Sequence, residues 1–240
     1  MAWRWEVVEH DHEIQNPTSA EKIRLLGDYV RLGPERRVLD VACGKGGPAV
    51  LLAEAFGCRI VGVERLPAFA DAARSRIAAR GLEHLVEVQT GDAAEFPFEQ
   101  EAWDVALCIG ASFVWGTIED AAARLAPAVG SGGFVAIGEP FWRRWPLPEG
   151  VDPEDFVSLD ETIDRFRRSG LALTGLIAAS EDDWDRYESL HWRAAEEWLA
   201  ENPDRPDAAD VRAGQEQKRA EYFRSRRPYL GWAIFVGRKS

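Results

Sequence analysis

Cysteine, basic charge and long hydrophobic runs are scarce in this chain of 240 residues. Its three cysteines are too few for a disulfide framework, and each lies in an apolar segment, which is typical of reduced, buried thiols. The 29 basic residues are outnumbered by 41 acidic ones, and the formal net charge of −12 repels phosphate backbones. No apolar run approaches the roughly 18–20 residues that cross a bilayer, and the N-terminal residues are too polar for a signal peptide. We therefore expect a cytoplasmic protein with neither a nucleic-acid nor a membrane partner.

Strand-like and helix-like segments alternate from residue 38 onward, after a first helix that begins near Thr18 and ends before Gly33. Helical patterns of about 10–15 residues between strands are typical of a doubly wound, mostly parallel sheet. With 46% apolar residues, the chain can cover both faces of such a sheet in one α/β domain, residues 1–240. We expect seven strands, over 38–42, 59–63, 85–90, 103–109, 133–138, 171–178 and 229–236, and intervening helices over 48–56, 67–80 and 118–125.

The second half of the chain contains segments that this alternation does not need. Residues 140–158 hold four prolines among aromatic and basic residues, which indicates a surface loop. Residues 181–227 are predicted to form a helical insertion, or cap, before the last strand. We expect these two segments and the irregular residues 1–17 to form a lid over the half built from residues 18–140.

A glycine-rich turn follows the first strand. That strand, over 38–42, runs into Gly44 and Gly46, and Pro48 opens a helix at the position that proline favours. Small residues in such a turn let the backbone approach a ligand at the carboxyl edge of the sheet. A dinucleotide-binding fingerprint requires a third glycine where this chain has Ala49, so that match fails by one position.

Acidic residues follow three successive strands near this turn. Asp40 ends the first strand, where it would repel the pyrophosphate of a dinucleotide but attract a cation. Glu64 ends the second strand, where a carboxylate can accept hydrogen bonds from both ribose hydroxyls. Asp92 follows the third strand and is placed to accept a hydrogen bond from an adenine amino group. The three acids together favour a cationic adenosine cofactor over an anionic one.

In residues 40–47, Glu64 and the pair Gly91-Asp92, the chain resembles the class I S-adenosylmethionine-dependent methyltransferases. The resemblance covers about residues 18–140 and implies a Rossmann-like, cofactor-binding half. Alanine at position 42 departs mildly from the family's acidic-x-Gly-x-Gly-x-Gly pattern. The resemblance implies S-adenosylmethionine as cofactor and S-adenosylhomocysteine as product. The residues that it implies in cofactor binding are Asp40, Ala42, Gly44, Gly46, Glu64, Arg65, Asp92, Ala93, Cys108 and Gly110.

A narrower likeness extends nearly end to end. It is carried by the segment from His12 to Pro17 with Ile14 and Asn16, by residues 139–142 and by residues 184–188. In these segments the chain is similar to a group of uncharacterised bacterial small-molecule methyltransferases. That group implies a small-molecule acceptor without identifying it.

Three side chains are candidates for the transfer step. Glu139 directly follows a buried strand, where apolar surroundings would raise its pKa and help it accept a proton. His12, with an ordinary pKa near 6.5, is a second candidate base. Tyr187 lies on one helical face with Trp184 and His191. We therefore expect Glu139, His12 and Tyr187 to be catalytic, although a strand-end acid, a solvated histidine and a core contact are their plain alternatives.

Features of metal-dependent and nucleic-acid methyltransferases are missing. No acid ends the fourth strand to bind Mg²⁺, and the histidines and cysteines lack metal-ligand spacing. The Asn/Asp-Pro-Pro-aromatic motif of nucleic-acid amino methyltransferases is absent. Because a sulfonium is a good leaving group, in-line displacement needs mainly alignment and the removal of a proton. We expect a metal-free reaction.

Ten tryptophans are many for this length. Aromatic faces beside acids would suit a flat aromatic or cationic acceptor. Arg143 and Arg144 favour an anionic group instead, so the charge of the acceptor stays open. The tryptophans expected near the carboxyl edge or in the insertion are Trp3, Trp5, Trp115, Trp142, Trp145, Trp184 and Trp192.

Three alternatives to a small-molecule methyltransferase stay open. An NAD-dependent oxidoreductase shares the sheet and the acid at Glu64, but Asp40 and the missing third glycine disfavour it. A non-catalytic S-adenosylmethionine-binding module would share every cofactor residue. A protein methyltransferase could recruit a basic partner with its acidic surface. Either a monomer or a homodimer is compatible with the sequence.

Overall fold

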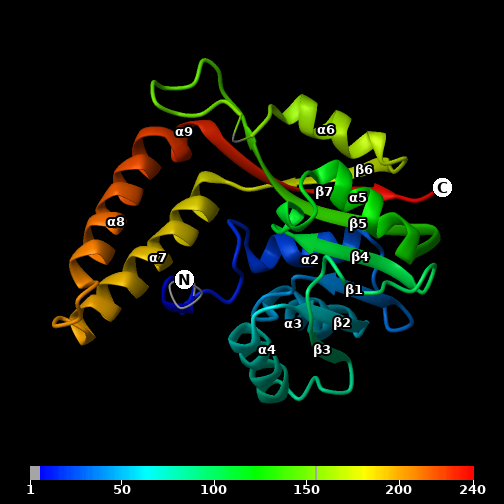
Figure 1. Cartoon of the computed structure of the whole chain (residues 1–240). Helices are drawn as coiled ribbons and strands as arrows, with labels where there is room; N and C mark the ends of the chain where they lie inside the picture. The colour runs from blue at the N-terminus through cyan, green and yellow to red at the C-terminus, as the bar shows by residue number, and fades with distance from the viewer. Residues whose placement is uncertain (1–5, 155) are drawn as a thin grey trace.

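A computed structural model describes residues 6–154 and 156–240. Its centre is a seven-stranded sheet with the order β3-β2-β1-β4-β5-β7-β6 (Figure 1). Strands β1 to β5 are parallel, and β7 is antiparallel to both of its neighbours. This sheet confirms the predicted doubly wound α/β fold. The strands are β1 (Arg37–Val41), β2 (Arg59–Glu64), β3 (Val86–Thr90), β4 (Trp103–Ile109), β5 (Val129–Trp142), β6 (Ala172–Ala178) and β7 (Leu230–Arg238).

Helices cover both faces of the sheet, because successive residues of a strand point to opposite sides. Val38 of β1 packs in one hydrophobic core with Ile23 and Leu52, whereas the next residue, Leu39, packs in a second core with Ile118. The first face is covered by α2 (Ala20–Tyr29), α3 (Gly47–Phe56) and α4 (Pro67–Ala79), and the second by α5 (Ile118–Leu125) and α6 (Leu159–Arg168).

A helical cap joins β6 to β7. It consists of α7 (Glu181–Glu201), α8 (Ala208–Glu221), the short turn η3 (Tyr222–Arg226) and α9 (Arg227–Tyr229). Ser180 and Asp183 form a capping box that starts α7, and Lys22 of α2 forms an ion pair with Asp183. Helices α7 and α8 project from the sheet as a pair, and the N-terminal segment lies between α7 and the sheet (Figure 1).

The structure differs from the predicted elements mainly in β5. We expected a strand over 133–138 and a loop from residue 140, but β5 continues to Trp142 and pairs with β7 to its end. Pro140 is tolerated there because the pairing of β5 with β4 ends at Gly138, so its missing N–H would face no strand on that side. Within the helical insertion predicted over 181–227, α8 passes into a π-helical turn at Tyr222. Over 6–154 and 156–240, no helix is long and apolar enough to cross a membrane.

Candidate active site

The glycine-rich turn after β1 is built from left-handed backbone. Gly44 and Gly46 have φ values of 56° and 73°, and Ala42 adopts a φ of 55° although it carries a Cβ. An L-residue pays about 1 kcal/mol for that conformation, so the chain holds Ala42 there against its own preference. The turn directs the backbone amide of Gly44 toward Glu64, whose Oε2 accepts its hydrogen bond over 2.9 Å.

Two buried carboxylates lie together beneath this turn. Asp40 is 2% exposed, and its Oδ2 has no hydrogen-bond partner among the described residues. Burial and the neighbouring charge of Glu64 raise the pKa of Asp40 to about 7. Glu64 is fixed in place, because its Oε1 also accepts a hydrogen bond from the backbone amide of Leu66 over 2.8 Å. Two acids with no ion-pair partner in the described part of the chain form a site that favours a cation.

The next strand end brings Asp92 and Arg65 to the same edge of the sheet. Asp92 is half-buried, and its Oδ1 accepts a hydrogen bond from the amide of Ala94 over 2.9 Å. Arg65 Nη1 lies 3.7 Å from Asp92 Oδ2, and Ala93 is buried beside them. Asp92 therefore keeps one oxygen facing Arg65 and solvent, where a ligand could reach it.

At the end of β4, Cys108 and Gly110 take different positions. The Cys108 side chain is fully buried in the second core, where burial raises the pKa of its thiol to about 12. Any contact between Cys108 and a ligand would therefore involve its backbone. Gly110 has a φ of 87° and faces the N-terminal segment, since a Cβ there would lie 1.9 Å from Asn16 Oδ1.

The N-terminal segment covers this crevice. Gln15 Oε1 accepts a hydrogen bond from the amide of Lys45 over 2.8 Å, and Asn16 Nδ2 donates one to Ile109 O over 2.7 Å. The cavity that remains between residues 13–16 and Asp40 has a volume of about 30 Å³. That volume is roughly the share of one water molecule in the liquid, so the segment must shift before a nucleoside can enter.

Glu139 and Ser112 form a polar pair on the neighbouring strands. Glu139 lies in β5 and Ser112 begins the turn η1 (Ser112–Val114) after β4, and the Ser112 hydroxyl donates a hydrogen bond to Glu139 Oε2. Burial raises the pKa of Glu139 to about 7, although this hydrogen bond opposes the shift. Glu139 directly follows Gly138, which is paired with Ile109 at the wall of the small cavity.

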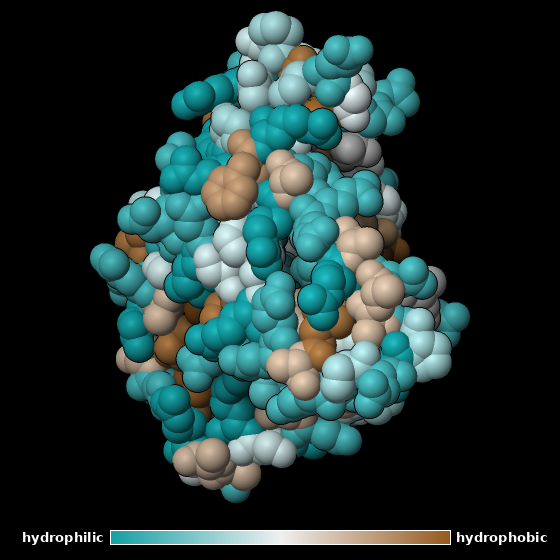
Figure 2. Space-filling model, turned by 90° about the vertical axis from the view of Figure 1, so that its left-hand side faces the viewer, coloured by the Kyte–Doolittle hydropathy of each residue, from teal (hydrophilic) through white to brown (hydrophobic). Residues whose placement is uncertain are grey.

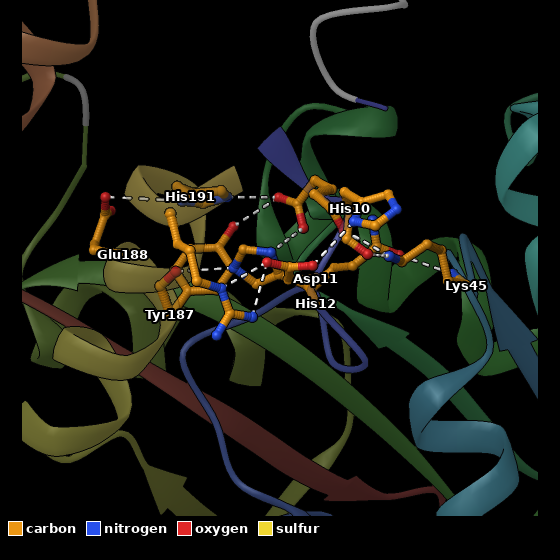
Figure 3. Close-up of polar contacts among 10 residues, drawn as sticks. His10, Asp11, His12, Lys45, Tyr187, Glu188 and His191 are labelled. Atoms are coloured by element: carbon orange, nitrogen blue, oxygen red, sulfur yellow. Dashed lines mark hydrogen bonds and ion pairs between the residues drawn. The ribbon is translucent and has the colours of Figure 1, made fainter. Parts of the chain in front are cut away.

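His12 and Tyr187 belong to a separate, largely buried cluster, the clasp, which we define as Glu9, His12, Tyr187, Glu188 and His191 (Figure 3). The fully buried ring of His12 contacts Tyr187 O through Nε2 over 2.8 Å, and burial lowers its pKa. The Tyr187 hydroxyl donates a hydrogen bond to Glu9 Oε1, 3.3 Å away, and burial raises the pKa of this phenol. The polar atoms of His12 and Tyr187, both predicted to be catalytic, therefore contact other residues of the clasp. The third candidate, Glu139, contacts Ser112 instead.

The clasp contains residues that sequence reasoning missed. Glu9 was not singled out, and His191 was noted only for its helical face. The available signal was the spacing Glu-x-x-His, which occurs at Glu9 and His12 and again at Glu188 and His191. Ser112 and Gln15 were also missed, because their contacts depend on how the segments meet.

Among residues 6–154 and 156–240, no tryptophan lines the cavity at Asp40. Trp142 and Trp184 are buried in the first core, and Trp145 is exposed. Trp142 also borders a cavity of about 520 Å³ between the loop at Val151 and η3. Trp3 and Trp5 lie outside the described residues. We predicted aromatic faces beside the acids of the crevice. The described residues that line its cavity include no aromatic side chain, so they do not support that prediction.

The chain is similar to known proteins along its whole length. The sequence profile described as "Methyltransferase domain" matches residues 38–133. The uncharacterized protein YjhP of Escherichia coli (strain K12) is 32% identical over 237 residues, which cover 96% of this chain and 95% of that protein.

Two crystal structures share the fold closely. One is of an S-adenosylmethionine-dependent methyltransferase from Thiobacillus denitrificans in complex with S-adenosyl-L-homocysteine, at 34% identity and a TM-score of 0.92, covering 98% of both chains. The other is of such an enzyme from Geobacter sulfurreducens in complex with the same compound, at 32% identity and a TM-score of 0.94, covering 100% of this chain and 99% of that one. This chain therefore belongs to the S-adenosylmethionine-dependent methyltransferases.

Proposed function

We propose that this enzyme methylates a small-molecule acceptor by in-line displacement and that Glu139 takes the acceptor's proton. The observation that carries the proposal is the pair of Glu139 and Ser112. The carboxyl group of Glu139 has a pKa of about 7 and accepts a hydrogen bond from Ser112, and Glu139 follows Gly138, which pairs with the cavity-lining Ile109. Such a group accepts a proton at neutral pH, where an ordinary exposed glutamate is a weaker base.

The described residues fit S-adenosylmethionine, which when bound supplies a methyl group on a cationic sulfur. Asp40 Oδ2 is buried and unpartnered, and Glu64 lies beside it, so a cationic ligand would relieve the repulsion between the two carboxylates. Each carboxylate oxygen of Glu64 accepts one backbone hydrogen bond and keeps a lone pair for a hydroxyl group.

We assign the remaining cofactor contacts in the same way. Asp92, with Arg65 and Ala93 beside it, would hold the adenine, and the backbone of Cys108 and Gly110 would border the crevice. The small residues Ala42, Gly44 and Gly46 would let the backbone approach the ligand closely. These residues bind and orient the cofactor, and the proton is handled by Glu139.

Coverage of the crevice supports a small acceptor. Residues 13–16 lie over it, and the clasp holds the same segment against α7 of the cap. We propose that residues 1–17, 140–158 and 181–227 act as a lid, as expected from the sequence. In this scheme His12 and Tyr187 position the lid, because their polar atoms contact Tyr187 O and Glu9.

The proposal is tested by calorimetric titration of the purified protein with S-adenosylhomocysteine, and with NAD in parallel. We expect one S-adenosylhomocysteine bound per chain and no binding of NAD. Glu64→Gln keeps the shape of the side chain and removes its charge. Because a hydrogen bond to a charged group contributes about 1.5–3 kcal/mol, we expect an affinity roughly 10–150 times lower. Glu54→Gln, in the exposed pair with Arg80, is the matched control and should bind like the wild type.

Other outcomes would redirect the assignment. Binding of NAD alone would favour the oxidoreductase alternative. Unchanged affinity of the Glu64→Gln variant would remove Glu64 from the cofactor site. Binding of S-adenosylhomocysteine without methyl transfer to any acceptor in a broad screen would indicate a non-catalytic binding module, and transfer to protein acceptors only would contradict a small-molecule substrate.

A further inference from the structure

The clasp brings together two Glu-x-x-His pairs from opposite parts of the chain. Glu9 and His12 lie in the N-terminal segment, and Glu188 and His191 lie one turn apart on α7. Figure 3 shows His191 between Glu188 and the N-terminal segment. Donor atoms of Glu9, His12 and His191 all lie within 4.8 Å of one another. The cluster is internal, since Glu9 and His12 are 3% and 0% exposed.

The hydrogen bonds of His12 leave two buried acceptors facing each other. Tyr187 O can only accept, so Nε2 of His12, 2.8 Å away, carries the ring proton. In neutral His12 the other nitrogen, Nδ1, is then an acceptor, and it lies 3.4 Å from Glu9 Oε2. Neither atom has a hydrogen-bond partner among the described residues. Two buried, unpartnered acceptors at this distance are unfavourable unless a proton or a metal ion lies between them.

A second proton on His12 is the alternative to a metal ion. That proton would make an imidazolium inside the protein, with the His191 ring centred 4.4 Å away. Complete burial of His12 penalises such a charge. Glu9 Oε2, which would face the proton, lies 3.4 Å from Nδ1, farther than in an ordinary hydrogen bond. A metal ion instead uses the lone pairs of His12 and Glu9 as they stand.

We propose that Glu9, His12 and His191 bind a divalent transition-metal ion. Metal–ligand bonds of about 2.1 Å place tetrahedral ligands about 3.4 Å apart, which is the spacing of His12 Nδ1 and Glu9 Oε2. His191 Nε2 lies 2.9 Å from Glu9 Oε1, so small side-chain adjustments complete the site. Two imidazoles and a carboxylate form a donor set that suits zinc or ferrous iron rather than magnesium or calcium.

The surroundings of the proposed ligands are those of a metal site. Ligating histidines commonly donate their second ring N–H to a carbonyl or a carboxylate, which fixes the ring. His12 has Tyr187 O in this position, and His191 Nδ1 lies 3.8 Å from Glu188 Oε2. The His191 side chain is 15% exposed, which gives an ion a route from solvent.

The proposed ion is structural, and the methyl transfer does not pass through it. It joins the N-terminal segment to α7 and so holds residues 13–16 over the crevice. The expectation of a metal-free reaction is unaffected. The proposal does revise the expectation that the histidines lack metal-ligand spacing. The repeated Glu-x-x-His spacing marks the two halves of the site in the sequence, but His12 and His191 are brought together only by the docking of the cap.

The test is a zinc titration of the full chain after treatment with a chelator, in competition with a chromophoric zinc indicator. We expect one Zn²⁺ per chain for the wild type. His191→Gln should lower the affinity by about 100-fold or more, and Glu188→Gln by about 10–100-fold, because the latter only orients His191. His10→Gln is the matched control: it lies in the same segment, but its exposed ring contacts only Asp11 through a hydrogen bond.

The absence of stoichiometric zinc binding by the wild type would overturn the proposal. Equal affinity in the wild type and in folded His191→Gln protein would also overturn it. If His191→Gln fails to fold, Co²⁺ added to the wild type decides the question. An intense visible absorption typical of low-coordinate cobalt supports the site, whereas the pale spectrum of hydrated cobalt contradicts it. Loss of zinc binding in His10→Gln would show that a surface histidine is responsible.

Discussion

Glu139 is the residue at which the proposed proton transfer can be measured directly. Its pKa of about 7 places it half protonated at neutral pH, and only the carboxylate can accept the acceptor's proton. The methyl-transfer rate of the wild type should therefore rise as the pH increases through about 7 and then level off. Glu139→Gln should lower the rate by about 10²–10⁴-fold and remove this inflection, while S-adenosylhomocysteine binds as before. Initial rates from pH 5.5 to 9 with a radiolabelled methyl donor measure both effects.

Ser112→Ala serves as the matched variant for this profile. The Ser112 hydroxyl stabilises the carboxylate form of Glu139, so its removal should move the inflection to higher pH without abolishing activity. A profile that is unchanged in both variants would exclude Glu139 as the base. A loss of cofactor affinity in Glu139→Gln would instead assign the residue to binding.

At the scale of elements, the N-terminal segment controls entry to the cofactor crevice. Its side chains at Gln15 and Asn16 are hydrogen-bonded across the crevice, and only about 30 Å³ is left beneath them. Opening must break the bond between Asn16 Nδ2 and Ile109 O. Since such a bond contributes about 1 kcal/mol, Asn16→Ala should increase the association rate of S-adenosylhomocysteine about fivefold in stopped-flow fluorescence.

His10→Ala is the control for this experiment, because it removes only an exposed ring. The hydrogen bonds that Lys45 Nζ donates to Glu9 O and His10 O involve the backbone and remain in this variant. It should leave the association rate unchanged. An Asn16→Ala variant that associates at the wild-type rate would mean that the segment opens without passing through this bond, and a slower rate would mean that Asn16 guides the cofactor inward.

At the scale of the whole molecule, the sequence specified the sheet better than it specified the site. Asp40, Glu64 and Asp92 follow parallel strands, and the carboxyl ends of such strands meet at one edge, so their proximity follows from local patterns. The direction of single side chains was harder to predict. Cys108 packs in the second core and the next residue, Ile109, in the first, so the Cys108 thiol points away from the crevice.

The clasp was beyond local reasoning for a different reason. Glu9 and His191 are joined by a hydrogen bond of 2.9 Å across 182 positions of sequence. This contact depends on the angle at which α7 leaves the sheet and on the ion pair between Lys22 and Asp183 that helps fix it. Neither has a periodic signal, whereas the strands and helices do.

We predict that the protein is a monomer. The side that carries α7 and α8 is mostly hydrophilic, with small, separated hydrophobic patches (Figure 2). A stable dimer usually buries about 800 Å² on each partner, and a net charge of −12 opposes self-association. We expect light scattering after size exclusion to give 26.8 kDa at low salt. A mass twice as large would contradict this prediction. The surface to mutate would then be formed by Leu176 on the edge strand β6 and by Leu25 and Tyr29 of α2. All three side chains are exposed, and α2 lies against β6.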